Sequence, residues 1–182
     1  MIISRVPAGC GSALDVGCGL GALSRRLRTI VPAVTGIDKD QRSIQIAAAH
    51  PDAGDIEYLH ADFMTWPLVP ASFDLITAMA SLHHMDAAVA LERMRELLRP
   101  GGVLAIVGLA RGSTPADVAL SVPAALISAR LHRNAGSRRT TANGYAAPIC
   151  WPPPVSYRQM RQVLRGTRYR CHLYWRYSLT WC

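Results

Sequence analysis

The sequence predicts an α/β fold in which one doubly wound, mostly parallel sheet carries helices on both faces. Three observations predict it. Short apolar runs alternate with helix-like segments through the first 109 residues, and a glycine-rich loop follows the first run. A Pro100-Gly101-Gly102 turn ends a helical pattern and leads into another apolar run. Strands and helices that alternate in this way form right-handed β-α-β units.

The apolar runs have the composition of strands that are buried in a parallel sheet. The five expected strands are Leu14–Val16, Val34–Ile37, Ile56–His60, Phe73–Met79 and Val103–Leu109. The helices expected between them are Ala22–Ile30, Arg42–His50 and Ala87–Leu98. The last helix is amphipathic, so we expect its apolar side to cover the sheet.

The first expected strand leads directly into the glycine-rich loop. Gly17, Gly19 and Gly21 form a G-x-G-x-G pattern just after the strand that carries Asp15. Because glycine lacks Cβ, such a loop lets a ligand approach the backbone, and in open α/β sheets it holds nucleotide-like cofactors. Asp38 ends the second strand 21 positions after Gly17, where an acidic residue accepts hydrogen bonds from ribose hydroxyls.

Other residues help to distinguish between cofactors. Asp62 and Phe63 follow the third strand, where a carboxylate can accept from an exocyclic amine and a ring can pack on a purine. A dehydrogenase also uses a glycine loop and a ribose-binding acid, but its usual pattern is G-x-G-x-x-G. Here the third glycine comes one residue early and Ala22 takes its usual place. Alanine is a tolerated variant at that place, so a dehydrogenase stays an alternative, although Asp15 and the Asp62-Phe63 pair resemble the methyltransferase pattern more closely.

With these motifs, the segment from Leu14 to about Gly108 resembles the class I S-adenosylmethionine-dependent methyltransferases. The resemblance implies a Rossmann-like methyltransferase fold of about seven strands, two of them after the fifth and the last one antiparallel. The sequence from Ser81 to Met85 is similar to the corresponding segment in the branch of this family that methylates small molecules. The implied cofactor is S-adenosylmethionine, and the implied product is S-adenosylhomocysteine.

The resemblance also implies residue roles. The loop glycines would let the backbone approach the methionine part, with Asp15 near its amino group. Asp38 would hold the ribose, Asp62 the adenine amine, and Phe63 would pack beside the adenine ring. The expected cofactor-binding residues are Asp15, Gly17, Cys18, Gly19, Gly21, Asp38, Lys39, Asp62, Phe63, Ala78 and Met79.

Two histidines are the candidates for catalysis. His83 or His84 could take a proton from a substrate hydroxyl, because histidine titrates near neutral pH. They could equally form only the pocket wall, since direct displacement can proceed through proximity and alignment alone. Candidate substrate-binding residues are Tyr145, Trp151 and Tyr157, although Trp151 could instead have a structural role.

The length of 182 residues indicates one domain. We expect a cofactor-binding core at 13–109, an insertion that serves as substrate lid at 110–155, and a closing helix and strands at 156–182. The closing elements are the helix Tyr157–Leu164 and the strands Tyr169–Trp175 and Tyr177–Trp181, which could form a hairpin or one bent strand. The protein could be a monomer or a homodimer.

Composition limits the other classes of function. The five cysteines are odd in number and lack C-x-x-C spacing, so we expect no disulfide framework and no metal. The longest apolar stretch, Val118–Ala129, is shorter than the roughly 20 residues of a membrane span. With no convincing signal peptide, a cytoplasmic protein without a membrane partner is expected.

The net charge of +8 is unevenly distributed, with ten arginines and no acidic residue after Asp117. This could attract nucleic acid, but all basic residues except Lys39 are arginine, which favours compositional bias. The function that the resemblance implies, methyl transfer to a small-molecule acceptor, is therefore kept as the favoured one. The alternatives are an RNA methyltransferase and, because few residues precede Ala13, a cofactor-binding module with little activity.

Overall fold

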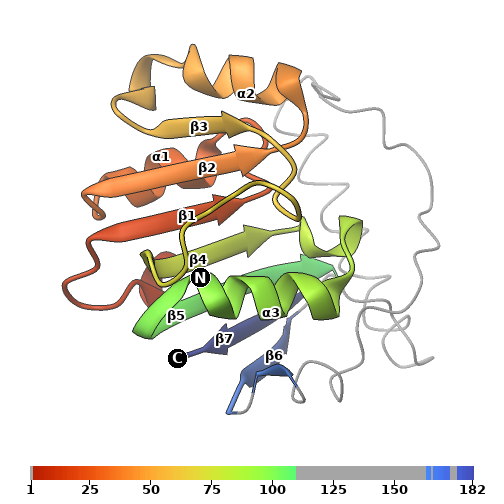
Figure 1. The fold of residues 1–182 in the computed structure, drawn as a ribbon. Helices are drawn as coiled ribbons and strands as arrows, with labels where there is room; N and C mark the ends of the chain where they lie inside the picture. The colour runs from red at the N-terminus through yellow and green to blue at the C-terminus, as the bar shows by residue number, and fades with distance from the viewer. Residues whose placement is uncertain (1, 110–162, 165, 173–175) are drawn as a thin grey trace, which may run out of the picture.

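Seven strands form one mixed sheet in the order β3-β2-β1-β4-β5-β7-β6 (Figure 1). The strands are β1 (Ser12–Val16), β2 (Ala33–Asp38), β3 (Glu57–His60), β4 (Phe73–Met79), β5 (Leu98–Leu109), β6 (Arg168–His172) and β7 (Arg176–Trp181). The first five are parallel, and β7 runs antiparallel between β5 and β6. The computed structural model describes residues 2–109, 163–164, 166–172 and 176–182. The predicted doubly wound sheet with an antiparallel last strand is confirmed.

Helices cover both faces of the sheet. In Figure 1, α1 (Ala22–Arg28) lies behind the sheet and α3 (Ala87–Leu97) in front of it, while α2 (Gln41–Ala48) packs against β2 and β3. Successive side chains of a strand point to opposite faces, so Leu14 of β1 packs on the α3 side and Ala13 on the α1 side. Among the described residues, no helix has the length and apolar character that a membrane span requires.

Aspartate caps fix where two of the helices begin. The Asp40 carboxylate accepts from the Ser43 amide at 3.2 Å, and the Asp86 carboxylate accepts from the amides of Ala88 and Val89 at 3.0 and 3.2 Å. These bonds satisfy amide groups that have no partner within the helix. Short 3-10 helices lie at η1 (Ile3–Arg5), η2 (Pro51–Ala53) and η3 (Leu82–His84).

The start of β5 differs from the prediction. The expected strand begins at Val103 after a Pro-Gly-Gly turn, whereas β5 begins at Leu98 and includes that segment. Phe73 of β4 pairs with Leu98 and Leu75 pairs with Val103, so the extra residues of β5 form an irregularity between two paired positions. Gly101 takes a φ of 79°, which allows the excursion. The turn residues therefore lie inside the strand rather than before it.

The last two strands form the hairpin that was one of the two expected arrangements. Tyr169 pairs with Leu179, and Ile106 of β5 pairs with the same Leu179 from the other side. The predicted insertion at 110–155, most of the closing helix, and the candidate residues Tyr145, Trp151 and Tyr157 lie outside the described residues.

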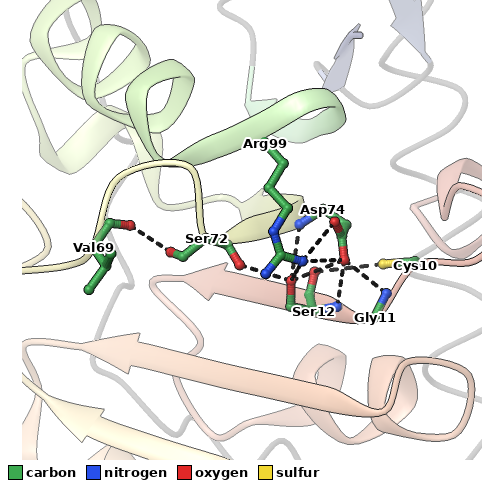
Figure 2. Close-up of polar contacts among 7 residues, drawn as sticks. All are labelled: Cys10, Gly11, Ser12, Val69, Ser72, Asp74 and Arg99. Carbon is green, nitrogen blue, oxygen red and sulfur yellow. Dashed lines mark hydrogen bonds and ion pairs between the residues drawn. The ribbon is translucent and has the colours of Figure 1, made fainter.

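A polar cluster ties together the starts of β1, β4 and β5 (Figure 2). Asp74 Oδ2 accepts from the amides of Gly11 and Ser12, both at 2.9 Å, and Arg99 Nη1 donates to Asp74 Oδ1 at 3.0 Å and to Ser12 Oγ at 3.1 Å. Partial burial raises the pKa of the Asp74 carboxyl, but the hydrogen bonds from Arg99, Gly11 and Ser12 outweigh it and hold that pKa below its ordinary value. The cluster lies at the edge of the sheet where the parallel strands begin.

Candidate active site

A cavity of about 790 Å³ lies at the opposite edge, where the parallel strands end. Ligands of open α/β sheets bind at this carboxyl edge, next to the point where strand order reverses. That point lies between β1 and β4 here. The lining residues are Val16, Gly17, Gly19, Ile37, Asp38, Lys39, Asp40, Ser43, Ala61, Asp62, Phe63, Met64, Ala80, Ser81, His84 and Met85.

The glycine loop is fastened to the end of β2. The amides of Gly17 and Cys18 both donate to the carbonyl of Ile37, at 2.8 and 3.2 Å. Gly17 has a φ of 70°, and a Cβ built on it would lie 2.3 Å from the Cβ of Ser81. A Cβ on Gly19, where φ is 51°, would meet no atom within 4 Å. Gly17 therefore allows β1 and the end of β4 to approach, whereas at Gly19, which lines the cavity, no protein atom lies where a Cβ would stand.

Asp38 connects the loop with the helix that follows β2. Its Oδ2 accepts from the Gly19 amide at 2.8 Å, and its Oδ1 accepts from the Asp40 amide at 2.9 Å. A carboxylate has about four acceptor positions, so two have no donor among the described residues and could accept from a ligand. The same side chain can hold the loop and bind two hydroxyl groups.

The turn after β3 presents a second acceptor together with a donor. Asp62 Oδ1 accepts from the Met64 amide at 2.8 Å, and the Asp62 carbonyl accepts from the amides of Thr65 and Trp66 at 3.1 and 2.9 Å. Within the described part of the chain, Asp62 Oδ2 and the Phe63 amide have no hydrogen-bond partner. Both residues line the cavity, which therefore offers one acceptor and one donor from adjacent residues.

The opposite wall begins where β4 ends. Ala80 has a φ of 55°, an unusual value for a residue with a Cβ, and its amide donates to the Val107 carbonyl at 2.7 Å. The buried Ser81 hydroxyl donates to the Val16 carbonyl at 2.6 Å. His84 is exposed and lines the cavity, and its ring centroid lies 4.0 Å from that of His83. Burial and the neighbouring His84 hold the pKa of His83 below its ordinary value, which favours the neutral ring.

The cavity brings together part of the predicted site. The predicted residues that line it are Gly17, Gly19, Asp38, Lys39, Asp62, Phe63 and His84. Those that do not line it are Asp15, Cys18, Gly21, Ala78, Met79 and His83.

Alternation along β4 explains two of these positions. Ala78 is fully buried in the core on the α3 side, and Met79 points the other way with 47% of its surface exposed. The wall of the cavity is formed instead by the next two residues, Ala80 and Ser81.

Cys18 and Gly21 are held by packing around Tyr58. A Cβ on Gly21 would lie 2.3 Å from the Tyr58 hydroxyl oxygen, and a Cβ on Gly36 would lie 3.0 Å from both Cys18 Sγ and the Tyr58 ring. Burial, with Asp15 and Asp38 nearby, raises the pKa of the Cys18 thiol and keeps it protonated. Gly21 thus provides room for the tyrosine, and Cys18 fills space above β2.

Asp15 lies beneath the loop, between the sheet and α1. Its side chain is 1% exposed, with Oδ2 accepting from Ser24 Oγ at 2.7 Å and Oδ1 from Thr77 Oγ1 at 3.0 Å. Burial raises the pKa of Asp15 from 3.8 to about 6, against the opposing effect of these two hydrogen bonds. The sequence predicts Asp15 beside the ligand, but the odd-numbered side chains of β1 face α1, which places the carboxyl off the cavity wall.

We expect Asp15→Asn to remove a pH dependence of folding. Because the folded pKa lies above the unfolded one, the folded state binds more protons, and stability falls as pH rises from about 4 to about 6. The shift corresponds to roughly 3 kcal/mol. In urea unfolding, the stability of Asp15→Asn relative to the wild type should therefore rise by about that amount between pH 4 and pH 7.

The exposed Asp52 provides the control, since Asp52→Asn removes a carboxyl without changing a buried one. Equal pH dependence in the wild type and Asp15→Asn would contradict the burial of a titrating carboxyl at this position.

Sequence reasoning missed several lining residues. Ser43 and Asp40 belong to the start of α2, and Met64 and Ala61 flank the Asp62-Phe63 pair. Asp40 carries a signal in the sequence, because an aspartate three residues before a serine at a predicted helix start is typical of a cap. Ala61 and Met64 carry no comparable signal, since their positions follow only from the fold of the turn.

Comparisons with known proteins agree with this geometry. A family model described as a methyltransferase domain matches residues 14–106. An uncharacterized methyltransferase of Mycobacterium tuberculosis is 34% identical over 192 aligned positions, which cover 100% of this chain and 91% of that protein. A ubiquinone biosynthesis O-methyltransferase of Xanthomonas campestris is 34% identical over 134 positions, which cover 71% of this chain and 55% of that protein.

Solved structures show the same arrangement. An S-adenosylmethionine-dependent methyltransferase from Mesorhizobium loti matches with a TM-score of 0.53 and 30% identity, over 60% of this chain and 51% of that one. The chain thus spans about half the length of that protein. A methyltransferase of Aquifex aeolicus matches 99% of this chain and 86% of its own with a TM-score of 0.64, and at 17% identity it shows the shared fold alone.

Proposed function

The chain belongs to the family of methyltransferase domains and uses S-adenosylmethionine as its methyl donor, and on this premise we propose that it methylates a small molecule bound beside the cavity. The observation that carries the proposal is the set of polar groups along the cavity. Asp38 offers two acceptor positions, and the turn at Asp62 and Phe63 offers an acceptor next to a donor.

These groups fit the parts of S-adenosylmethionine. The free positions on Asp38 match the two ribose hydroxyls. The acceptor on Asp62 and the Phe63 amide match the amine and the ring nitrogen of adenine. The open space at Gly19 would admit the methionine part, where a side chain would intrude. Asp15 would support the loop from beneath rather than touch the ligand, because its carboxyl is buried against Ser24 and Thr77.

When bound, S-adenosylmethionine supplies a methyl group on a positively charged sulfur. Ala80, Ser81, His84 and Met85 would form the wall past which the acceptor approaches. An acceptor oxygen held there would take up this methyl group, with S-adenosylhomocysteine as the leaving group. His84 would take the proton that the acceptor hydroxyl loses. The main contribution of the chain would be alignment of the two reactants.

The acceptor class draws support from the relatives. Proteins named O-methyltransferases match this chain, among them one for ubiquinone biosynthesis and one for malonyl-[acyl-carrier protein]. An oxygen atom of a small molecule is therefore the acceptor that we propose to test first.

Binding and transfer can be tested separately. Calorimetry should show that the wild type binds S-adenosylmethionine and S-adenosylhomocysteine. With a donor labelled in its methyl group, label should then appear in solvent-extractable small molecules from a lysate treated with ribonuclease. No binding by the wild type would refute the cofactor assignment, and label recovered in RNA from an untreated lysate would refute the small-molecule acceptor.

The two histidines should differ once an acceptor is available. We expect His84→Gln to lower kcat by about 100-fold, because a positioned base contributes rate enhancements of this order. The neighbouring His83→Gln should change kcat by less than about threefold, since His83 does not line the cavity. Equal kcat in His84→Gln and the wild type would leave alignment as the whole contribution of this wall.

A further inference from the structure

Arg93 of α3 does not line the cavity, but its side chain contacts the turn that carries Asp62. Its Nε donates to the Phe63 carbonyl at 2.8 Å, and its Nη2 donates to the Trp66 carbonyl. Its guanidinium carbon also lies 5.4 Å from the centroid of the Phe63 ring. These three contacts join residues 27 to 30 positions apart in the chain. One side chain therefore holds both ends of a turn that belongs to the cavity.

Arg93 acts on the peptide unit between Phe63 and Met64, whose amide donates to Asp62 Oδ1. The Phe63 ring is 5% exposed and belongs to the core that includes Met94 of α3, so this residue is fixed from its side chain as well as from its carbonyl. The Asp62 side chain is in turn oriented by the Met64 amide within the same turn. Arg93 therefore holds the peptide unit that orients the Asp62 acceptor, next to the one that carries the Phe63 donor.

An acceptor beside a donor distinguishes between purines. The edge of adenine presents an amine donor next to a ring nitrogen that accepts, whereas a 6-oxo purine presents a carbonyl acceptor next to an N–H donor. The pair at Asp62 and Phe63 matches the first edge and opposes the second at both positions. Opposed polar groups in a site discriminate strongly, because both partners lose their hydrogen bonds.

We propose that Arg93 is a positioning residue that sets the preference of the cavity for the adenine base of its ligand. This inference rests on the proposed role of the cavity as the cofactor site. Arginine suits the task because its planar guanidinium donates in two fixed directions while its face packs on an aromatic ring. A lysine at this position would keep the charge but could not reproduce both directions.

The test compares two ligands that differ only in the base, S-adenosylhomocysteine and its 6-oxo analogue S-inosylhomocysteine. For Arg93→Met, calorimetry should show affinity for the adenosyl ligand reduced by about tenfold or more, and affinity for the inosyl ligand changed by less than about threefold. Arg93→Lys should reduce the ratio of adenosyl affinity to inosyl affinity by a smaller factor than Arg93→Met does. If Arg93→Met does not fold, the ratio measured for Arg93→Lys decides the question.

Arg95→Met is the matched control. Arg95 lies on the same helix, and its replacement by methionine removes the same charge. Its side chain is exposed and donates to the Val163 carbonyl, which is far from the turn in sequence. For Arg95→Met, the ratio of adenosyl affinity to inosyl affinity should equal that of the wild type. In an Asp62→Ala background, Arg93→Met should lower adenosyl affinity by less than about threefold, because the two residues act through one contact.

The outcomes separate this inference from the proposed function. If the wild type does not bind S-adenosylhomocysteine, the cofactor site itself is refuted. If the wild type binds and Arg93→Met loses affinity for both ligands equally, or for neither, the cofactor site stands and the positioning role of Arg93 is overturned.

Discussion

Replacement of Asp38 by alanine is expected to weaken S-adenosylhomocysteine binding by 100-fold or more. The carboxylate would lose two charge-assisted hydrogen bonds to the ribose, each worth about 1.5–3 kcal/mol, and 1.4 kcal/mol corresponds to a factor of about ten in affinity. The Gly19 and Asp40 amides would also lose their acceptor. Isothermal calorimetry measures the change directly.

A remote aspartate controls for the loss of charge. Asp52 is exposed on the short helix before β3, and Asp52→Ala should leave affinity unchanged. Thermal unfolding of each variant shows whether the fold is intact. Affinity of Asp38→Ala within about threefold of the wild type would contradict the role of this carboxylate in binding.

The second large effect is expected at Gly17, where a side chain has neither the backbone conformation nor the space it needs. In Gly17→Ala the positive φ costs about 1–2 kcal/mol, and the new Cβ would lie 2.3 Å from the Cβ of Ser81. Relief of that overlap must displace β1 or the end of β4. We expect unfolding free energy to fall by about 3 kcal/mol and cofactor binding to be lost. Urea unfolding and calorimetry measure the two effects.

Substitutions at two other glycines distinguish the effect of backbone strain from the effect of overlap with Ser81. Gly54 has a φ of 57° with no atom within 4 Å of its would-be Cβ, so Gly54→Ala imposes backbone strain of about 1–3 kcal/mol without any overlap. Gly19→Ala should have a similar effect on stability but should weaken binding, because its Cβ enters the cavity. Equal stability of Gly17→Ala and Gly54→Ala would show that contact with Ser81 imposes no constraint.

Local patterns predicted most of the sheet and its helices. The apolar runs of β1 to β5 are bounded by turn residues, and helix starts are marked by caps such as Asp86, so neighbouring residues contain the information needed. The glycine loop, Asp38 and the turn at Asp62 were also predictable, because each directly follows a strand whose carboxyl end lies at one edge. The early start of β5 was not predictable from local patterns, because it depends on pairing between Leu98 and Phe73.

Side-chain direction limited the prediction of the site. Asp15 directly precedes the loop in sequence, yet its carboxyl faces α1 because strand residues alternate between faces. Ala78 is turned into the core for the same reason. The contacts of Arg93 with the turn at Phe63 require α3 to lie against that turn, and no local pattern specifies this.

The Ser12, Asp74 and Arg99 cluster in Figure 2 has a consequence for how such a protein can diversify. It joins β1, β4 and β5 at the edge away from the cavity, so the pairing of these strands has support that does not come from residues at the ligand edge. Selection can therefore alter the loops around an acceptor while the scaffold keeps its register. Loops around an acceptor can then change while the contacts that join β1, β4 and β5 are kept.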